Sequence, residues 1–262
     1  MSNSIHPTAI VSPQAELGEG NTIGPFVHIH DQVRIGSNNQ LMTGSVLKPG
    51  VSLADNNSLH EYSVLGGEPQ DLGFDGHTSF VEVGSGNVFR ESVTVHRSHK
   101  EGDVTVIGNE NFLMANVHIG HDCQLGNNVV IAPSSGLGGF VSVGDKAFIS
   151  GGVMVHQFVN IGRFAMIGGN SKITQDVLPF MITDGNPAQV HGLNIVGLRR
   201  GGFNKTMLSE LKQAYRILFS DNDKLDNKLG QLVTLPGDAV AELIEFISAA
   251  KRGFHRGKSE TD

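Results

Sequence analysis

Residues 107–137 read IGNENFLMANVHIGHDCQLGNNVVIAPSSGL. Every sixth residue of this stretch is aliphatic: Ile107, Leu113, Ile119, Leu125, Ile131 and Leu137. A period of six matches neither the 3.6 residues of a helical turn nor the two-residue alternation of a half-buried strand. It is typical of a triangular solenoid, in which each side of a coil holds one short strand and one turn. Three such sides make a coil of 18 residues, roughly 4.8 Å high.

The same phase continues on both sides of this stretch. It returns over residues 11–65 and 83–95 and runs on to residue 173, and all 25 of its positions are Val, Ile, Leu or Phe. We expect these side chains to fill the inside of a prism. A glycine often follows the repeated aliphatic residue, as at Gly120 and Gly138. We expect these glycines to occupy corners that need a positive φ.

The phase is interrupted twice. At the two interruptions the expected core positions fall on Asp71, His77 and Glu101. Polar side chains of this kind are not buried without partners, so we predict loops near residues 67–80 and 97–105. Long loops on a rigid scaffold tend to carry functional residues.

The repeat ends near Pro179, and the following sequence has helical spacing. Apolar residues at this spacing predict helices over residues 203–219, 223–233 and 237–254. The predicted fold class is therefore an all-β solenoid followed by helices. We place a β-helix domain over residues 1–190 and a helical domain over residues 191–262.

The composition argues against membrane-spanning, secreted and disulfide-rich proteins. The chain of 262 residues has 39% apolar and 17% charged residues, and no apolar run near the ~18 residues of a membrane helix. Its start does not resemble a signal peptide, and its single cysteine excludes an internal disulfide framework. We therefore expect a cytoplasmic protein without stable membrane insertion.

Charge is unevenly distributed along the chain. Residues 1–192 hold 8 basic and 17 acidic side chains, a net charge of −9, whereas residues 193–262 hold 11 and 9, a net charge of +2. This balance argues against nucleic-acid binding. An acidic partner would be expected to meet the C-terminal third.

Side chains 18 residues apart stack on successive coils, and this brings a polar cluster together. We expect one side of the prism to carry His118, His121, Asp122, His156 and Gln157. Imidazole titrates near neutral pH and can accept a proton from a hydroxyl or an amine, while a carboxylate neighbour selects its tautomer. The cluster therefore favours general-base chemistry. Because most of the 12 histidines must be structural, a non-catalytic scaffold stays open as an alternative.

A metal site is a second alternative. His96, His118 and His121 could form a three-histidine site, as in hexapeptide-repeat carbonic anhydrases. However, Val95 and Ile119 are four hexads apart, which predicts that His96 lies on a neighbouring side of the prism. We therefore expect no metal.

The hexapeptide run, the helical tail and six segments together resemble one bacterial family, the UDP-N-acetylglucosamine O-acyltransferases. The segments are GGEPQDL (66–72), FRESVTVHR (89–97), NVHIGHDC (116–123), VHQF (155–158), IGGNS (167–171) and NPAQVHGLNIVGLRRGGF (186–203). The resemblance covers roughly residues 5–255. It implies a left-handed parallel β-helix, an exception to the right-handed crossover rule. It also implies a homotrimer with active sites between subunits, and no cofactor.

The resemblance also implies an activity and its residues. The family transfers a 3-hydroxyacyl chain from acyl carrier protein to the 3-hydroxyl of UDP-N-acetylglucosamine, the first step of lipid A biosynthesis. The resemblance implies that His121 is the general base, that Asp122 is its partner and that the Gly139 N–H is the oxyanion donor. The implied substrate-binding residues are Gln70, Asp71, His96, His118, His156, Gln157, Gly169, Asn194 and Arg200. Asn194 and Arg200 would contact the nucleotide, and Gly169 would leave the acyl groove open to a longer chain.

Four positions depart from the family pattern. The family usually has His at Phe140, Lys at Gly73, Glu at Val196 and Arg at Gly201. These positions are expected around the acceptor and the carrier, whereas the three catalytic positions are unchanged. A related hexapeptide enzyme that N- or O-acylates a modified amino-sugar nucleotide therefore remains an alternative.

Overall fold

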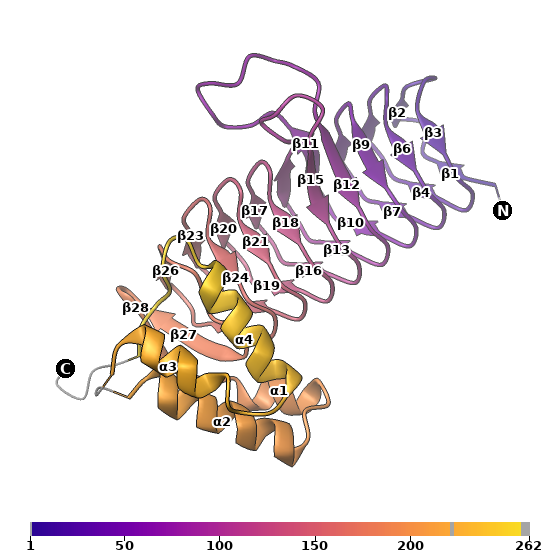
Figure 1. Ribbon diagram of the computed structural model, residues 1–262. Helices are drawn as coiled ribbons and strands as arrows, with labels where there is room; N and C mark the ends of the chain where they lie inside the picture. Colours follow the sequence, from indigo (N-terminus) through magenta and orange to yellow (C-terminus); the bar gives the residue numbers. More distant parts are fainter. Residues whose placement is uncertain (1, 221–222, 258–262) are drawn as a thin grey trace.

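The computed structural model describes residues 2–220 and 223–257. Short strands wind into three-sided coils that stack as a left-handed parallel β-helix, and each side of the prism forms one sheet (Figure 1). The solenoid predicted from the six-residue period is therefore confirmed.

The three sheets are named here first, second and third. The first contains β1 (Ser4–Ile5), β4 (Thr22–Ile23), β7 (Gln40–Leu41), β10 (Ser58–Leu59), β13 (Val88–Phe89), β16 (Phe112–Leu113), β19 (Val130–Ile131), β22 (Phe148–Ile149), β25 (Met166–Ile167), β27 (Met181–Gly185) and β28 (Ala188–Leu193). The second contains β2 (Ile10–Val11), β5 (His28–Ile29), β8 (Val46–Leu47), β11 (Val64–Gly67), β14 (Thr94–His96), β17 (His118–Ile119), β20 (Gly136–Leu137), β23 (Met154–Val155) and β26 (Lys172–Ile173). The third contains β3 (Glu16–Leu17), β6 (Arg34–Ile35), β9 (Val51–Leu53), β12 (Phe80–Val83), β15 (Val104–Ile107), β18 (Gln124–Leu125), β21 (Ser142–Val143) and β24 (Asn160–Ile161).

Strand register locates the two loops. Residues 18 apart pair in an uninterrupted coil, as His118 pairs with Gly136. The pairing distance grows to 30 residues between Val64 and Thr94 and to 24 between Thr94 and His118. The extra residues form the loops at 68–79 and 97–103, which project from one edge of the prism (Figure 1). Both predicted loops are confirmed.

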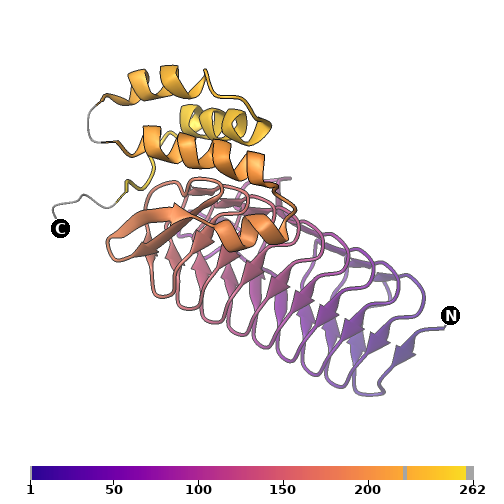
Figure 2. The same cartoon turned by 90° about the horizontal axis from the view of Figure 1, so that it is seen from below.

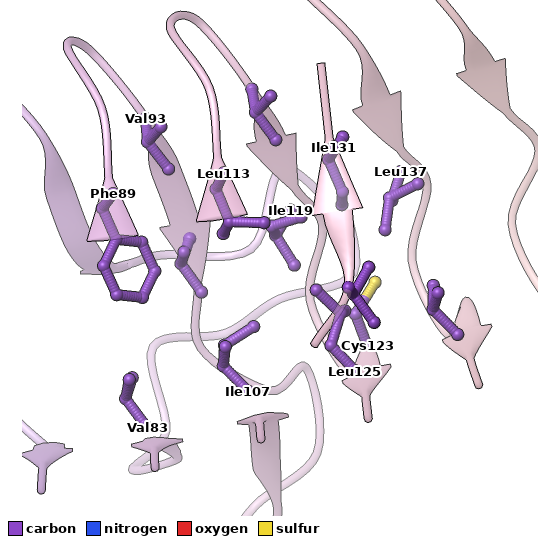
Figure 3. Packing of buried hydrophobic residues seen from close by; sticks show 14 of the residues in the cluster. Val83, Phe89, Val93, Ile107, Leu113, Ile119, Cys123, Leu125, Ile131 and Leu137 are labelled. Atoms are coloured by element: carbon purple, nitrogen blue, oxygen red, sulfur yellow. The ribbon is translucent and has the colours of Figure 1, made fainter. Parts of the chain in front are cut away.

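The repeated aliphatic residues fill the prism, as predicted. All 25 positions except Val11 and Leu17 are buried, and side chains from the three sheets meet inside the coils (Figure 3). The repeat begins one hexad before the expected start, because Ile5 belongs to β1 and pairs with Ile23.

The corners of the coil correct one expectation. Positive φ falls three residues after the repeated aliphatic residue, as at Asp122 (φ 60°) and Phe140 (φ 62°), and not at Gly120 or Gly138. Those two glycines are needed for a different reason, since a Cβ at Gly138 would lie 2.7 Å from the backbone nitrogen of Gln157. Close approach of successive coils, not backbone conformation, selects glycine there.

Helices cover the C-terminal end of the prism. They are α1 (Ile195–Arg200), α2 (Lys205–Leu218), α3 (Leu225–Leu232) and α4 (Asp238–Ala249). The last three confirm the predicted helices, whereas α1 and the antiparallel β27–β28 hairpin were not predicted. In Figures 1 and 2 the helices lie against the last coils, at the end opposite the N-terminus.

The helices and the hairpin share a second apolar cluster, which includes Phe164, Phe180, Leu198, Leu211 and Leu243. The predicted domain division at residues 190 and 191 falls inside β28 and stays a prediction, and residues 258–262 of the predicted helical domain lie outside the described residues. Within the described ranges, no helix combines the length and apolar character that crossing a bilayer requires.

Candidate active site

His121 and Asp122 lie at the corner that follows β17. His121 Nδ1 is 2.6 Å from Asp122 Oδ2, and both side chains are nearly buried. The two residues are adjacent in sequence, and their side chains meet because Asp122 adopts a left-handed conformation with φ of 60°. The predicted pairing of a histidine with a carboxylate is present.

Asp122 accepts further hydrogen bonds from the 97–103 loop. Its Oδ1 accepts from Ser98 Oγ at 2.5 Å and its Oδ2 accepts from the His99 N–H at 2.9 Å. Burial alone would raise the pKa of Asp122, but the hydrogen bonds from Ser98, His99 and His121 outweigh it and lower that pKa below 3.8. Asp122 is therefore an ionised acceptor at neutral pH.

Two further histidines lie one coil apart on the same sheet. The rings of His96 and His118 are 4.8 Å apart edge to face, and His118 Nδ1 is 2.8 Å from Thr94 Oγ1. Burial, with smaller contributions from the neighbouring His118 and His121, lowers the pKa of His96 to about 4. Burial and the charge of His121 also lower the pKa of His118. Both rings are neutral at pH 7.

The expected placement of His96 on a neighbouring side was wrong. The six extra residues of the 97–103 loop lengthen that coil from 18 to 24 residues, so Val95 pairs with Ile119 in the second sheet. Four hexads here make one full coil. His96 consequently shares a face with His118 and His121.

Gly139 stands one coil beyond His121 at the same corner. A Cβ at this position would lie 2.5 Å from His121 Cε1 and 2.6 Å from His121 Nε2. Glycine therefore leaves the space that the imidazole ring occupies. In the part of the chain that the structure describes, the Gly139 N–H binds no acceptor.

A groove of about 460 Å³ runs along this corner. Eight of the residues proposed from the sequence line it: Gln70, Asp71, His96, His118, His121, Gly139, His156 and Gln157. Gln70 and Asp71 come from the 68–79 loop, whereas the others come from successive coils. Asp122 lies behind His121, away from the groove. The size suits a small-molecule site.

Three proposed residues lie elsewhere in the chain. Gly169 is exposed at the corner after the first sheet. Asn194 caps α1, since its Oδ1 accepts from the Gly197 N–H at 3.0 Å, and its Nδ2 donates to the Phe164 carbonyl. Arg200 is exposed in the last turn of that helix. One chain alone does not bring these three residues to His121.

The departures from the family pattern have local explanations at two positions. Phe140 packs edge to face against His121, with ring centroids 5.3 Å apart, and stacks on Phe158. Gly201 ends α1 against Phe164, whose Cε1 would lie 2.3 Å from an added Cβ. Nothing in the structure explains Val196, which is exposed.

Gly73, the fourth departure, completes a turn in the 68–79 loop. Its N–H donates to Asp71 Oδ1 at 2.8 Å. The same carboxylate lies 3.7 Å from His99 Nε2, and the rings of His99 and His121 are 5.6 Å apart. The two loops therefore meet beside the groove.

Sequence reasoning missed several residues around His121. Ser98, His99 and Thr105 hold Asp122, and Thr105 Oγ1 accepts from the Asp122 N–H at 2.8 Å. Met154 lines the groove and is exposed. The second interruption of the repeat was the only available signal for Ser98 and His99.

The three-histidine metal site finds no support in the geometry. Among residues 2–220 and 223–257, one group of three or more histidine, cysteine or acidic side chains brings its ligand atoms within 4.8 Å of one another. That group is His60, Glu61 and Glu91, and it does not include His96, His118 or His121.

Two family models match parts of the chain. Residues 176–255 match the second domain of UDP-N-acetylglucosamine O-acyltransferases, and residues 105–139 match the bacterial transferase hexapeptide repeat. The first match covers the hairpin and the helices, and the second covers the coils that carry His121 and Gly139.

Curated relatives match over nearly the full length. An acyl-[acyl-carrier-protein]–UDP-N-acetylglucosamine O-acyltransferase from Thermodesulfovibrio yellowstonii is 43% identical over 259 residues, covering 97% of this chain and all of that protein. The protein of the same name from Paraburkholderia xenovorans is 40% identical, with 96% and 99% covered.

Solved structures of UDP-N-acetylglucosamine acyltransferases are also similar to this chain over nearly its full length. A UDP-N-acetylglucosamine acyltransferase from Bacteroides fragilis has a TM-score of 0.94 at 34% identity, covering 96% of this chain and all of that one. The enzyme from Campylobacter jejuni has a TM-score of 0.91 at 32% identity, with 97% and 100% covered. The chain belongs to the family of acyl-[acyl-carrier-protein]–UDP-N-acetylglucosamine O-acyltransferases.

Proposed function

We propose that this protein transfers a 3-hydroxyacyl chain from acyl carrier protein to the 3-hydroxyl of UDP-N-acetylglucosamine, the first step of lipid A biosynthesis. Family membership supports the reaction and both substrates. The observation that carries the assignment to named residues is the His121–Asp122 pair, 2.6 Å apart, at the wall of a groove that also exposes Gly139. Acyl carrier protein is a co-substrate, and the reaction needs no cofactor.

The tautomer of His121 determines which ring nitrogen can accept a proton from the acceptor. Because Asp122 is an ionised acceptor, His121 carries its proton on Nδ1 and presents a lone pair on Nε2. Nε2 takes the proton of the acceptor 3-hydroxyl while the oxygen attacks the thioester carbonyl carbon. Asp122 supports the positive charge that develops on His121.

The tetrahedral intermediate then collapses. The Gly139 N–H donates to its oxyanion, an interaction that contributes about 2.7–4 kcal/mol in comparable sites. The carbon–sulfur bond breaks, and His121 returns its proton to the departing thiolate. The products are the 3-O-acylated sugar nucleotide and the free thiol of the carrier.

The remaining groove residues suit acceptor binding. Asp71, Gln70 and Gln157 offer polar groups opposite a sugar, and His118 and His96 are neutral hydrogen-bonding rings. The buried Nδ1 of His96 has no hydrogen-bond partner within the described residues. The residue itself lines the groove, and this position supports a binding role for His96.

A homotrimer would complete the site. Gly169, Asn194 and Arg200 cannot reach His121 within one chain, so we assign them to the site of a neighbouring subunit. The carrier would dock on the positive C-terminal third. Arg252 supports this docking, since its Nη2 lies 3.4 Å from Nδ1 of His156 at the groove.

The test is a substrate panel. The purified protein is assayed with 3-hydroxyacyl carrier protein and either UDP-N-acetylglucosamine or its 3-amino analogue, and acetyl coenzyme A serves as an alternative donor. Efficient transfer to UDP-N-acetylglucosamine from the carrier supports the proposal. Transfer to the amino analogue alone would replace it with the N-acyltransferase alternative. No transfer with any pair would leave the scaffold alternative.

A further inference from the structure

The 97–103 loop begins with two residues that contact Asp122 on the side away from the groove. Ser98 is completely buried and does not line the groove. Its Oγ lies 2.5 Å from Asp122 Oδ1, and the next residue, His99, donates its N–H to Asp122 Oδ2 at 2.9 Å. Both oxygens of the carboxylate are thus held from the side opposite the substrates.

The loop also sets the direction of the Ser98 hydroxyl. The Lys100 N–H donates to Ser98 Oγ at 3.0 Å, which occupies a lone pair of that oxygen. The hydroxyl proton is left for Asp122 Oδ1, since its other acceptor, the Lys100 carbonyl, is 3.4 Å away. Ser79 Oγ in turn donates to the Ser98 carbonyl and ties the two loops together.

These contacts fix the orientation of the Asp122 carboxylate relative to the His121 ring. A carboxylate that accepts from Ser98 and His99 has its plane fixed on both oxygens, so Oδ2 faces His121 Nδ1. A hydrogen bond to an ionised group is short and roughly twice as strong as a neutral one. Without the Ser98 hydroxyl, a buried Oδ1 would be left unpaired, and the carboxylate could rotate.

We propose that Ser98 is a positioning residue, which acts through Asp122 to hold His121 in the tautomer that presents Nε2 to the acceptor. This assignment rests on the proposed function for the role of His121. Ser98 itself touches neither substrate. Its role differs from that of a loop anchor, because Ser79 and the His99 N–H already attach the loop.

Three substitutions separate these roles. Ser98→Ala removes the hydroxyl, and Ser98→Cys keeps nearly the same volume with a weak donor. Ser98→Thr retains the hydroxyl. Ser45→Ala is the matched control, because Ser45 is equally buried and its hydroxyl donates to the Met42 carbonyl far from the site.

Two measurements follow for each variant. Steady-state kinetics should show kcat reduced about tenfold to a hundredfold in Ser98→Ala and Ser98→Cys. The acceptor KM should stay within about twofold, since Ser98 is not part of the groove. Ser98→Thr should regain most of the rate, and Ser45→Ala should match the wild type.

The second measurement needs no turnover. Nitrogen-15 NMR of histidine-labelled free protein at pH 8 should find the His121 proton on Nδ1 in the wild type and in Ser98→Thr. A mixture of tautomers is expected in Ser98→Ala and Ser98→Cys. Wild-type kcat in Ser98→Ala, or a lost rate with His121 still in the wild-type tautomer, would overturn the proposal. If the wild type transfers no acyl chain, the proposed function fails, and the NMR comparison still decides the role of Ser98.

Discussion

Gly139 lies directly beside the ring of His121, at a distance that leaves no room for a methyl group. A Cβ at position 139 would stand 2.5 Å from Cε1 and 2.6 Å from Nε2 of the imidazole. Glycine at position 139 therefore leaves room for the proposed base, and its N–H is the proposed oxyanion donor.

Gly139→Ala should disable the enzyme without unfolding it. The added methyl group must displace the His121 ring, and a shift of about 1 Å in a catalytic group costs on the order of a hundredfold in rate. We expect kcat to fall by at least about that factor. Gly230→Ala is the control, because an added Cβ in α3 meets nothing within 4 Å and alanine is the better helix residue. A Gly139→Ala enzyme with normal kcat would show that the ring position is not critical.

His121→Ala should remove catalysis and leave the fold intact. A positioned general base contributes roughly 10²- to 10⁴-fold, and the β-helix core is formed by other side chains. The circular dichroism spectrum and the oligomeric state should match those of the wild type. His28→Ala, a histidine at the N-terminal coils that stacks on His30, is the matched control. Substantial turnover by His121→Ala would end the general-base assignment.

The buried histidines predict a pH dependence of stability. An unfolded histidine binds a proton near pH 6.5, whereas His96 in the folded protein binds one only near pH 4. Between these values the unfolded state holds more protons, so the free energy of unfolding falls as the pH falls through this window. His118 contributes in the same direction. The Asp122 contribution is lost only at lower pH, below 3.8.

Melting temperatures at pH 7.5, 6 and 5 measure this effect. We expect the wild type to lose stability toward pH 5, and His96→Gln to lose less. His6→Gln, at an exposed position, should behave as the wild type. Equal losses in the wild type and in His96→Gln would show that another group controls the acid response.

The six-residue period was sufficient to predict the prism, its core and the side that carries His121. Period-based inference works here because each coil repeats one contact pattern, so residues 18 apart must stack. The same rule placed His118, His121 and Gln157 on one side of the prism, whereas Gly139 was assigned only through the family resemblance. It failed for His96, because the 97–103 loop changes the length of one coil and thereby shifts the register.

Other features carry no periodic signal. The β27–β28 hairpin and α1 depend on packing against the last coils, through residues such as Phe164 and Phe180 that join the second apolar cluster. Ser98 belongs to a loop, and its contact with Asp122 depends on how the two loops fold together. Gly169 and Arg200 stay predictions, since their proposed roles require a neighbouring subunit.

Arg163 connects the last coils of the prism to α4. Its Nε lies 2.6–2.7 Å from both carboxylate oxygens of Glu242 in α4, and its guanidinium carbon lies 4.9–5.7 Å from the ring centroids of Phe164, Phe180 and Phe203. The ion pair is one-third exposed, so it contributes at most about 1 kcal/mol. Each cation–π contact at such a site adds roughly 0.5–1 kcal/mol.

Together these contributions amount to about 1.5–4 kcal/mol, so Arg163→Met should lower the melting temperature by roughly 3–16 °C. Arg34→Met removes two surface hydrogen bonds to Ser52 Oγ and should change the melting temperature little. Combining Arg163→Met with Glu242→Gln in a double-mutant cycle separates the ion pair from the aromatic contacts. Unchanged melting of Arg163→Met would show that the helices hold without this link.

Gly169→Met should shorten the acyl chain that the enzyme accepts. An added Cβ meets its nearest atoms at 3.5 and 3.9 Å, which is ordinary contact, and the residue is exposed. The substitution should therefore leave the single chain folded. It should affect only a molecule or subunit that contacts residue 169. If that neighbour is the acyl groove of an adjacent subunit, the methionine fills its far end. Each methylene that no longer fits loses about 0.8 kcal/mol of burial, so two excluded methylenes predict a shift in kcat/KM of more than tenfold toward shorter donors.

A panel of acyl carrier proteins with 3-hydroxyacyl chains of increasing length measures the shift, and Gly230→Met in α3 is the control. An unchanged chain-length profile would remove Gly169 from the acyl site and, with it, one of the reasons for assigning the site to two subunits.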